Sequence, residues 1–174
     1  MKENIVTAGV VFIIAVLIAG CAAKAPVVQD GKQVAMFVLP DRGIRDGMQE
    51  NERNDRNEVG QFMEEDLINS LSHEGYHATL IQNRNQYIQG SAAYLVFVKI
   101  NELHLVGKAS RFWLGHAGGP TILNAHYEVS GSDNKLTLAY DDVDSTIRDW
   151  SISPRELNHR FVDKINDNLV GKSR

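Results

Sequence analysis

The residues His73-Glu74-Gly75-Tyr76-His77 form an H-E-x-x-H pattern. In zinc peptidases this pattern places two histidines, one helical turn apart, on the same metal ion, and the glutamate acts as general base on the metal-bound water. Such chemistry needs one uninterrupted helix through all five residues. Here Gly75 is a typical helix-ending residue, and a strand-like run begins at Tyr76. We therefore predict that His73 and His77 lie on different elements, and a zinc-dependent hydrolase remains an alternative interpretation.

A second group with possible chemistry is Arg111-Phe112-Trp113, just before the glycine-rich residues 115–120. An exposed cation beside two aromatic side chains is typical of a partner-binding surface. The same aromatic residues could instead close one end of the core, and the sequence leaves both interpretations open. The glycine-rich run lacks the Lys and Ser or Thr of a phosphate loop and precedes a strand pattern, so we expect a hairpin connection.

Residues 41–57 carry charges of both signs and no apolar periodicity, which predicts a long polar loop. Long loops in compact domains are either mobile or functional, and Arg42, Arg45 and Arg53 are therefore candidate partner-binding residues. The acidic stretch from Asp141 to Asp149 lacks the ligand spacing of a calcium loop and predicts a solvated loop. The histidines outside the H-E-x-x-H pattern show no metal-ligand spacing, and we expect neither a cofactor nor a metal.

Cys21 is the only cysteine of the chain and follows the uncharged residues 5–20, which end in Ala19 and Gly20. A short apolar run closed by small residues is typical of a cleaved secretory signal, and an uncleaved single membrane span is the alternative. An exported domain with one cysteine cannot form an intrachain disulfide, so its stability must come from its core.

Removal of the signal leaves enough chain for one domain with a sizeable core. The composition is ordinary for a globular protein, with 43% hydrophobic and 23% charged residues. A formal net charge of −4 argues against nucleic acid as the main partner, because nucleic-acid binding normally needs a concentrated basic face.

The periodicity of the mature chain predicts an α+β domain with a mixed sheet of about five strands and two helices packed on it, in the order β-α-β-β-β-β-α. The first helix is expected from residue 58, capped by Asn57, and the last from a capping box at Ser153 with Pro154 as the first helical residue. The expected elements are strands at 33–39, 76–82, 93–106, 121–129 and 136–140, and helices at 58–74 and 153–170.

The sequence before Cys21 resembles a bacterial lipoprotein signal, in which the cysteine becomes the lipidated first residue. By this resemblance Cys21 is the lipidation site, and Ala22 after it favours sorting to the outer membrane with the domain facing the periplasm. The mature chain is similar to small bacterial lipoproteins with an uncharacterised α/β domain, through residues 34–39, 67–76, 108–119 and 121–131. Related domains occur in activators of peptidoglycan synthases and in curli-secretion lipoproteins, and no catalytic residues come with the resemblance.

We accordingly expect a signal peptide at residues 1–20, a lipidated tether at 21–32 and an α/β lipoprotein domain at 33–171. The leading expectation is a non-enzymatic module of the bacterial cell envelope that is anchored by its lipid. It would bind a protein partner in envelope assembly, secretion or cell-wall maintenance. A carrier of a small ligand or lipid, with a pocket between sheet and helices, is a further alternative.

Overall fold

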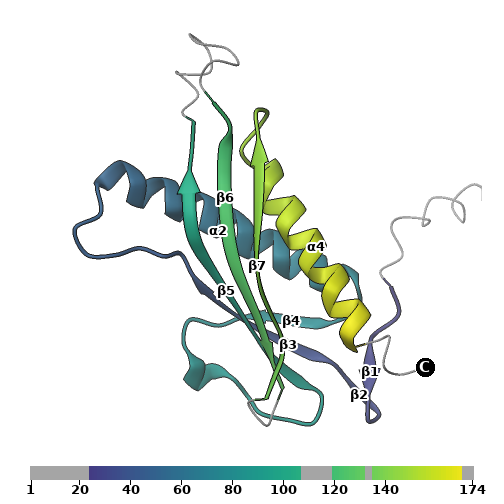
Figure 1. Ribbon diagram of the computed structural model, residues 1–174. Coiled ribbons are helices and arrows are strands. Elements are labelled where there is room, and N and C mark those ends of the chain that lie inside the picture. The colour runs from purple at the N-terminus through teal and green to yellow at the C-terminus, as the bar shows by residue number, and fades with distance from the viewer. Residues whose placement is uncertain (1–23, 107–118, 132–134, 170–174) are drawn as a thin grey trace, which may run out of the picture.

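The computed structural model describes residues 24–106, 119–131 and 135–169, and these form a five-stranded mixed sheet with two long helices (Figure 1). The strand order is β4-β3-β5-β6-β7. Strand β3 is parallel to β4 and β5, and β5, β6 and β7 are successively antiparallel. In chain order the elements are β3 (Ala35–Asp41), α2 (Glu50–His73), β4 (His77–Leu80), β5 (Ala93–His104), β6 (Thr121–Ser130), β7 (Leu136–Thr146) and α4 (Ile152–Leu169). The predicted α+β class and the order β-α-β-β-β-β-α are confirmed.

The main core lies between the sheet and the two helices. Strand β6 shows the reason most clearly, because every second side chain, from Leu123 to Val129, is at most 1% exposed. These side chains meet the apolar stripe of α4, in which Leu157, Phe161 and Ile165 are also fully buried. The ring of Phe161 stacks on that of Tyr127 with 4.4 Å between centroids. Burial of this size is the main favourable term in folding.

A smaller cluster covers part of the opposite face of the sheet. Leu39, Ile81 and Leu95 form its buried centre. The segment after β4, which includes the short 3₁₀ helix η2 (Arg84–Gln86), places Tyr87 edge-on against Phe37 with ring centroids 5.4 Å apart. The two helices are therefore not the only cover of the sheet.

Helix α2 begins at Glu50, eight residues before the predicted start. The N-cap is Gln49, and Asn57 is an interior helical residue whose side chain accepts a hydrogen bond from Arg42. The expected long polar loop therefore shrinks to residues 42–49, and Arg53 lies in the first turns of the helix. The prediction failed because residues 50–57 carry no apolar stripe, and half of them are Asn or Asp, which have low helix propensity.

Strand β7 continues to Thr146, so the predicted acidic loop is wrong over its first half: Asp141, Asp142 and Asp144 belong to the strand. Aspartate is unfavourable in strands on average, and here ion pairs with neighbouring elements override that tendency.

The predicted capping box at the start of α4 is also wrong, because the helix already begins at Ile152. The Oγ of Ser153 is buried and has no hydrogen-bond partner among the described residues. The turn before the helix is held by Asp149, whose carboxylate accepts a hydrogen bond of 2.8 Å from the backbone N–H of Ser151.

Candidate functional site

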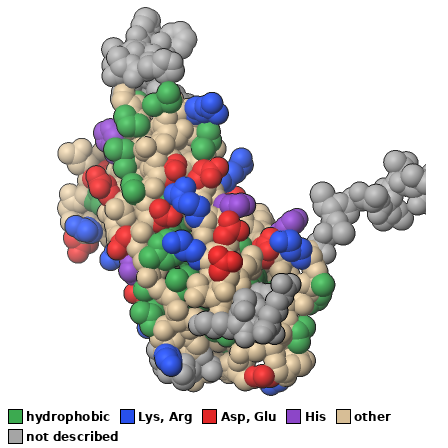
Figure 2. All heavy atoms as spheres, turned by 45° about the vertical axis from the view of Figure 1, so that its right-hand side comes forward, with side chains coloured by type: hydrophobic (Ala, Val, Ile, Leu, Met, Phe, Trp, Pro, Cys, Tyr) green, Lys and Arg blue, Asp and Glu red, His purple; other side chains and the backbone are tan. Residues whose placement is uncertain are grey.

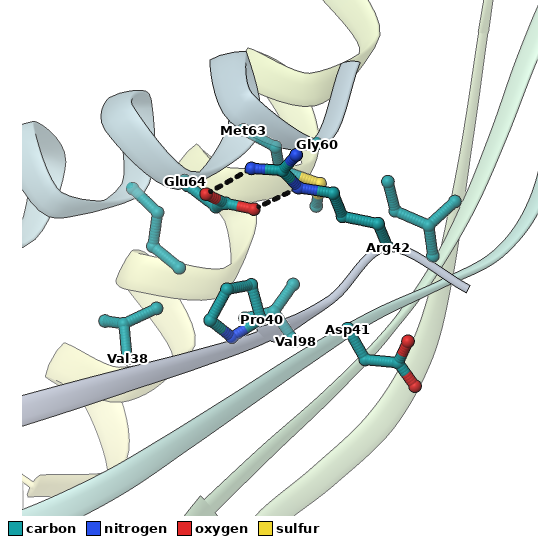
Figure 3. Close-up of a pocket in the computed structure, with 10 residues that line it drawn as sticks. Val38, Pro40, Asp41, Arg42, Gly60, Met63, Glu64 and Val98 are labelled. Atoms are coloured by element: carbon teal, nitrogen blue, oxygen red, sulfur yellow. Dashed lines mark hydrogen bonds and ion pairs between the residues drawn. The ribbon is translucent and has the colours of Figure 1, made fainter. Parts of the chain in front are cut away.

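Arg42 lies just after β3 and is fixed against α2 (Figure 3). Its Nε and Nη2 donate hydrogen bonds of 2.8 and 3.0 Å to the two carboxylate oxygens of Glu64, and its Nη1 donates one of 2.9 Å to Asn57. The hydrogen bond to Glu64 raises the pKa of the guanidinium. Gly60 makes this approach possible, because a Cβ there would stand 2.7 Å from the Cγ of Arg42. Arg42 therefore belongs to the framework.

The loop after Arg42 is tied to the sheet by Arg56, a residue that sequence reasoning did not single out. The Arg56 side chain is 7% exposed, and its Nη1 donates hydrogen bonds of 3.1 Å to the carbonyls of Arg42 and Ile100. Its Nε lies 3.4 Å from Glu52, one turn earlier in the helix. This i, i+4 pair of opposite charges was the available signal that the helix starts before residue 58.

Arg45 and Arg53 differ from Arg42. Both are exposed, and neither forms an ion pair or a side-chain hydrogen bond with the described part of the chain. They lie on the 42–49 loop and in the first turns of α2, at one end of the domain. Arg111, Phe112 and Trp113 lie outside the described residues. Of the predicted binding set, two arginines thus remain available to a partner on the described surface.

Several hollows in the described part of the chain bear on the expectation of a ligand pocket. The space between sheet and α2 beside Arg42 is about 10 Å³, and a single water fills such a space. A larger hollow of about 610 Å³ opens near the ends of the helices, beside residues 25–29 and the residues Val34, Tyr94 and Leu169. The enclosed space between the sheet and α2 is therefore too small for an organic ligand. Two open hollows of about 500 and 490 Å³ are also lined in part by Arg42, Glu64 and Leu80.

The H-E-x-x-H residues span the end of α2. The N–H of Tyr76 donates to the carbonyl of Leu71, and that of Gly75 donates to Ser72, each over 3.1 Å. With Gly75 at φ +93°, these bonds form a Schellman motif. His73 is thus the last residue of α2, and His77 is the first residue of β4. The prediction that the two histidines lie on different elements is confirmed. Within the described residues, no group of three or more His, Cys, Asp or Glu side chains is arranged to hold a metal ion.

The same corner holds the N-terminal segment of the described chain, an arrangement we call the N-terminal clasp (residues 24–27 against 73–75). The backbone N–H of Lys24 donates to His73 over 3.3 Å, and that of Val27 donates to Gly75 over 3.0 Å. The Nζ of Lys24 lies 2.6 Å from the carboxylate of Glu74.

Glu74 also binds the second helix, because Asn166 of α4 donates a hydrogen bond of 2.9 Å to it. Burial alone would raise the pKa of the Glu74 carboxyl. The hydrogen bonds and charge of Lys24, together with the hydrogen bond from Asn166, outweigh this effect, so the net result is a lowered pKa. The glutamate is therefore ionised and engaged in holding the segment. No sequence motif announces this role.

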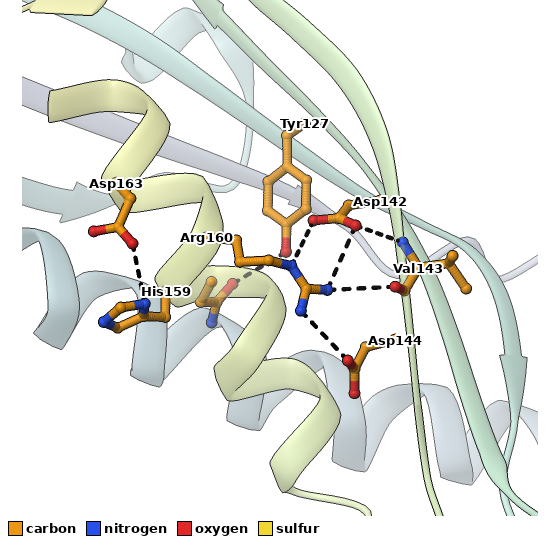
Figure 4. Close-up of polar contacts among 8 residues, drawn as sticks. Tyr127, Asp142, Val143, Asp144, His159, Arg160 and Asp163 are labelled. Atoms are coloured by element: carbon orange, nitrogen blue, oxygen red, sulfur yellow. Dashed lines mark hydrogen bonds and ion pairs between the residues drawn. The ribbon is translucent and has the colours of Figure 1, made fainter. Parts of the chain in front are cut away.

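A third polar group joins α4 to β7 (Figure 4). The guanidinium of Arg160 lies 2.9 Å from Asp142 and 3.4 Å from Asp144, and its Nη2 donates a hydrogen bond of 3.3 Å to the carbonyl of Val143. Figure 2 shows blue and red side chains interspersed over this side of the molecule. Asp142 and Asp144 thus share the charge of Arg160, and within the described residues they belong to no group that could hold a metal ion.

On the opposite face of the sheet, His126 lies between two carboxylates. Its Nε2 is 3.0 Å from Glu128 and its Nδ1 is 3.0 Å from Asp141. The hydrogen bond to Glu128 and, next to it, that to Asp141 raise the pKa of His126, although its partial burial opposes them. A protonated imidazole satisfies both contacts, because both ring nitrogens are then donors.

None of the helices in the described ranges is both long and apolar enough to cross a membrane.

Comparison of the sequence with protein-family models and with curated proteins finds no match. Among solved structures, a PelC dodecamer from Paraburkholderia phytofirmans is 12% identical over 79% of this chain and 90% of that chain, with a TM-score of 0.49. A PelC variant from the same organism is 12% identical over 85% and 94%, with a TM-score of 0.47. A neuraminyllactose-binding hemagglutinin homolog from Helicobacter pylori is 11% identical over 85% and 93%, with a TM-score of 0.34. These likenesses are too distant to carry an argument about function.

Proposed function

We propose that this chain is a lipid-anchored, non-enzymatic lipoprotein of the bacterial cell envelope that binds a protein partner. The proposal rests on the sequence around Cys21. This residue is the only cysteine of the chain, and it follows an uncharged run that ends in small residues. A single lipidated cysteine at the start of the mature chain would hold the domain at a membrane surface. The domain would face the periplasm, with the outer membrane favoured by Ala22.

The partner surface is the end of the domain formed by the 42–49 loop and the first turns of α2. Arg45 and Arg53 supply exposed cations there that pair with no side chain in the described part of the chain. Ile44, 37% exposed, adds an apolar side chain on the same loop. Cations beside an apolar group are a common composition for a protein-binding surface. The segment from Arg111 to Trp113 is proposed as a second contact.

The test has two parts. Metabolic labelling with a radioactive fatty acid should label the wild-type chain, and the Cys21→Ser variant should remain unlabelled. Crosslinking in intact cells followed by purification should then recover a discrete partner with the wild type. The double variant Arg45→Glu, Arg53→Glu should recover at least several-fold less of that partner at equal abundance. An unlabelled wild type contradicts the anchor, and unchanged recovery by the double variant contradicts the surface.

A carrier function is the second candidate, favoured by the 610 Å³ hollow at the other end of the domain. Apolar residues such as Val27, Val34 and Leu169 contribute to its wall. Native mass spectrometry of the gently purified protein would reveal a bound lipid or other small molecule as an added mass. If the measured mass equals that of the protein alone, under conditions that keep a known protein–lipid complex intact, the carrier function is contradicted.

A further inference from the structure

Residues 24–34 are held on the domain. Lys24, three positions after the cysteine, is already in the N-terminal clasp. The segment then forms a small two-stranded sheet, β1 (Val28–Gln29) with β2 (Lys32–Gln33). Further bonds fix it: the Val34 N–H donates to Val27 over 2.8 Å, and the Tyr94 hydroxyl donates to Gln29 over 2.8 Å. Most of the tether expected at residues 21–32 is therefore part of the folded unit.

This docking shortens the free connection to the membrane. The three steps of chain from Cys21 to Lys24 span at most about 10 Å, whereas the free tether expected from sequence would reach three to four times as far. A domain on so short a connection cannot turn freely above a bilayer. The side of the domain that carries the clasp must lie next to the lipid surface.

The length of helix α2 determines which part of the domain lies far from the lipid surface. It contains 24 residues and is therefore about 36 Å long. Its C-terminal end forms the clasp, and its N-terminal turns carry Arg53. Figure 1 shows the two ends of α2 on opposite sides of the domain, with the C-terminal end near α4 and β1.

We propose that the N-terminal clasp mounts the domain rigidly on the membrane, with the face formed by β1, β2 and the C-terminal ends of α2 and α4 against the lipid. The surface around Arg45 and Arg53 is thereby held about 30 Å away from the headgroups. This inference rests on the proposed lipidation of Cys21. Val28, 59% exposed on β1, and the exposed Lys32 on β2 suit contact with headgroups.

Gly75 is the residue through which the mount can be tested. A Cβ on Gly75 would collide with the carbonyl oxygen of Ala25, so a side chain there pushes the segment off the corner. Gly47 is a matched control, because it also has a positive φ, +79°, but a Cβ there would have no atom of the described residues within 4 Å. Gly75→Ala and Gly47→Ala share backbone strain and differ in the collision with the segment.

The experiment uses the full lipidated chain in vesicles of phosphatidylethanolamine and phosphatidylglycerol that contain headgroup-quencher lipids. The thioether occupies the sulfur of Cys21, so a fluorophore can be placed on one new cysteine, either Asp167→Cys or Arg53→Cys. Asp167 is exposed near the C-terminal end of α4, next to Asn166 of the clasp region. We expect quenching several-fold stronger at residue 167 than at residue 53, in the wild type and in Gly47→Ala.

In Gly75→Ala the ratio of quenching at the two positions should fall toward one. A second variant tests the same idea without touching the fold: twelve Gly and Ser residues inserted after Cys21 lengthen the free connection by about 20 Å and should also lower the ratio. Equal quenching at both positions in vesicle-bound wild type would overturn the orientation and leave the anchor standing. An unchanged ratio in both Gly75→Ala and the insertion variant would overturn the clasp as a mount. Failure of the wild type to join the vesicles would overturn the proposed function itself.

Discussion

Replacing Arg42 by glutamate should destabilise the fold, whereas the same change at Arg45 or Arg53 should not. The Arg42 guanidinium donates three hydrogen bonds of 2.8 to 3.0 Å, two to Glu64 and one to Asn57. The side chain of Glu64 is only 10% exposed, so Arg42→Glu would place a second carboxylate against one that water reaches poorly.

The magnitude follows from the burial of the two partners. Breaking a fully buried pair costs about 3–5 kcal/mol, because the remaining charge has no partner. The side chain of Arg42 is 34% exposed, so water screens part of that cost. We expect the free energy of unfolding to fall by about 2–3 kcal/mol in Arg42→Glu. Exposed Arg45→Glu and Arg53→Glu should stay within about 0.5 kcal/mol of the wild type.

Urea unfolding followed by far-ultraviolet circular dichroism measures all three values under the same conditions. The charge-swapped variant Arg42→Glu, Glu64→Arg should recover part of the lost free energy, and a double-mutant cycle then gives the coupling of the pair. Equal destabilisation by all three single variants, or no coupling in the cycle, would refute the structural role of Arg42. The distinction matters for function, because lost partner binding in Arg42→Glu would report misfolding, whereas the same loss in Arg45→Glu would report contact.

Three further changes test other parts of the fold. Asn158→Ala should lower the free energy of unfolding by about 3 kcal/mol, because the wholly buried Asn158 binds the Met63 carbonyl, Asp66 and the Tyr127 hydroxyl. As a control, Asn168→Ala, at a partly buried position, should lower it far less when both variants are unfolded in urea. The pKa of His126 is higher in the folded state than in the unfolded state. Its contribution to the stability of the fold is therefore fully present below the unfolded pKa near 6.5 and is lost as pH rises through the folded pKa. His126→Gln should therefore lower the melting temperature at pH 5 more than at pH 9, and an equal effect at both would contradict the two carboxylate contacts. Gly75→Ala should lose about 1–2 kcal/mol more than Gly47→Ala in urea unfolding, since only Gly75 lies against Ala25; equal losses would mean that the N-terminal segment does not rest there.

The elements that the sequence predicts well are those whose burial follows a simple period. Strand β6 alternates strictly, and its buried members are the ones the alternation selects. The C-terminal end of α2 was predictable because Gly75 supplies the positive φ that a Schellman motif requires. In both places a local rule and the tertiary structure demand the same residue.

The errors occur where polar contacts between distant elements determine the structure. Residues 50–57 are helical although no apolar stripe marks them, and the buried Arg56 in this stretch bonds to carbonyls at positions 42 and 100. Asp142 and Asp144 lie in a strand, where each forms an ion pair with Arg160 on another element. A single sequence does not show which charges will meet, so neither element could be bounded from its own residues.

The candidate site shows the same division. The sequence grouped Arg42, Arg45 and Arg53 because they lie in one polar segment. The structure separates them, since only Arg42 is opposite Glu64. The docking of residues 24–33 could not be anticipated either, because the bonds of the clasp run mainly from backbone groups, which carry no sequence signal.

The H-E-x-x-H residues obtain their structural meaning from this docking. The positive φ of Gly75 ends the helix, and a zinc site of the peptidase kind requires a helix that continues to His77. The same helix end turns Glu74 toward Lys24 and Asn166 and leaves room at Gly75 for the carbonyl of Ala25. A change that made the pattern more helical, such as Gly75→Ala, would therefore displace the N-terminal segment. The roles of Gly75 and Glu74 follow from their contacts with residues 24–27, and these roles require no metal.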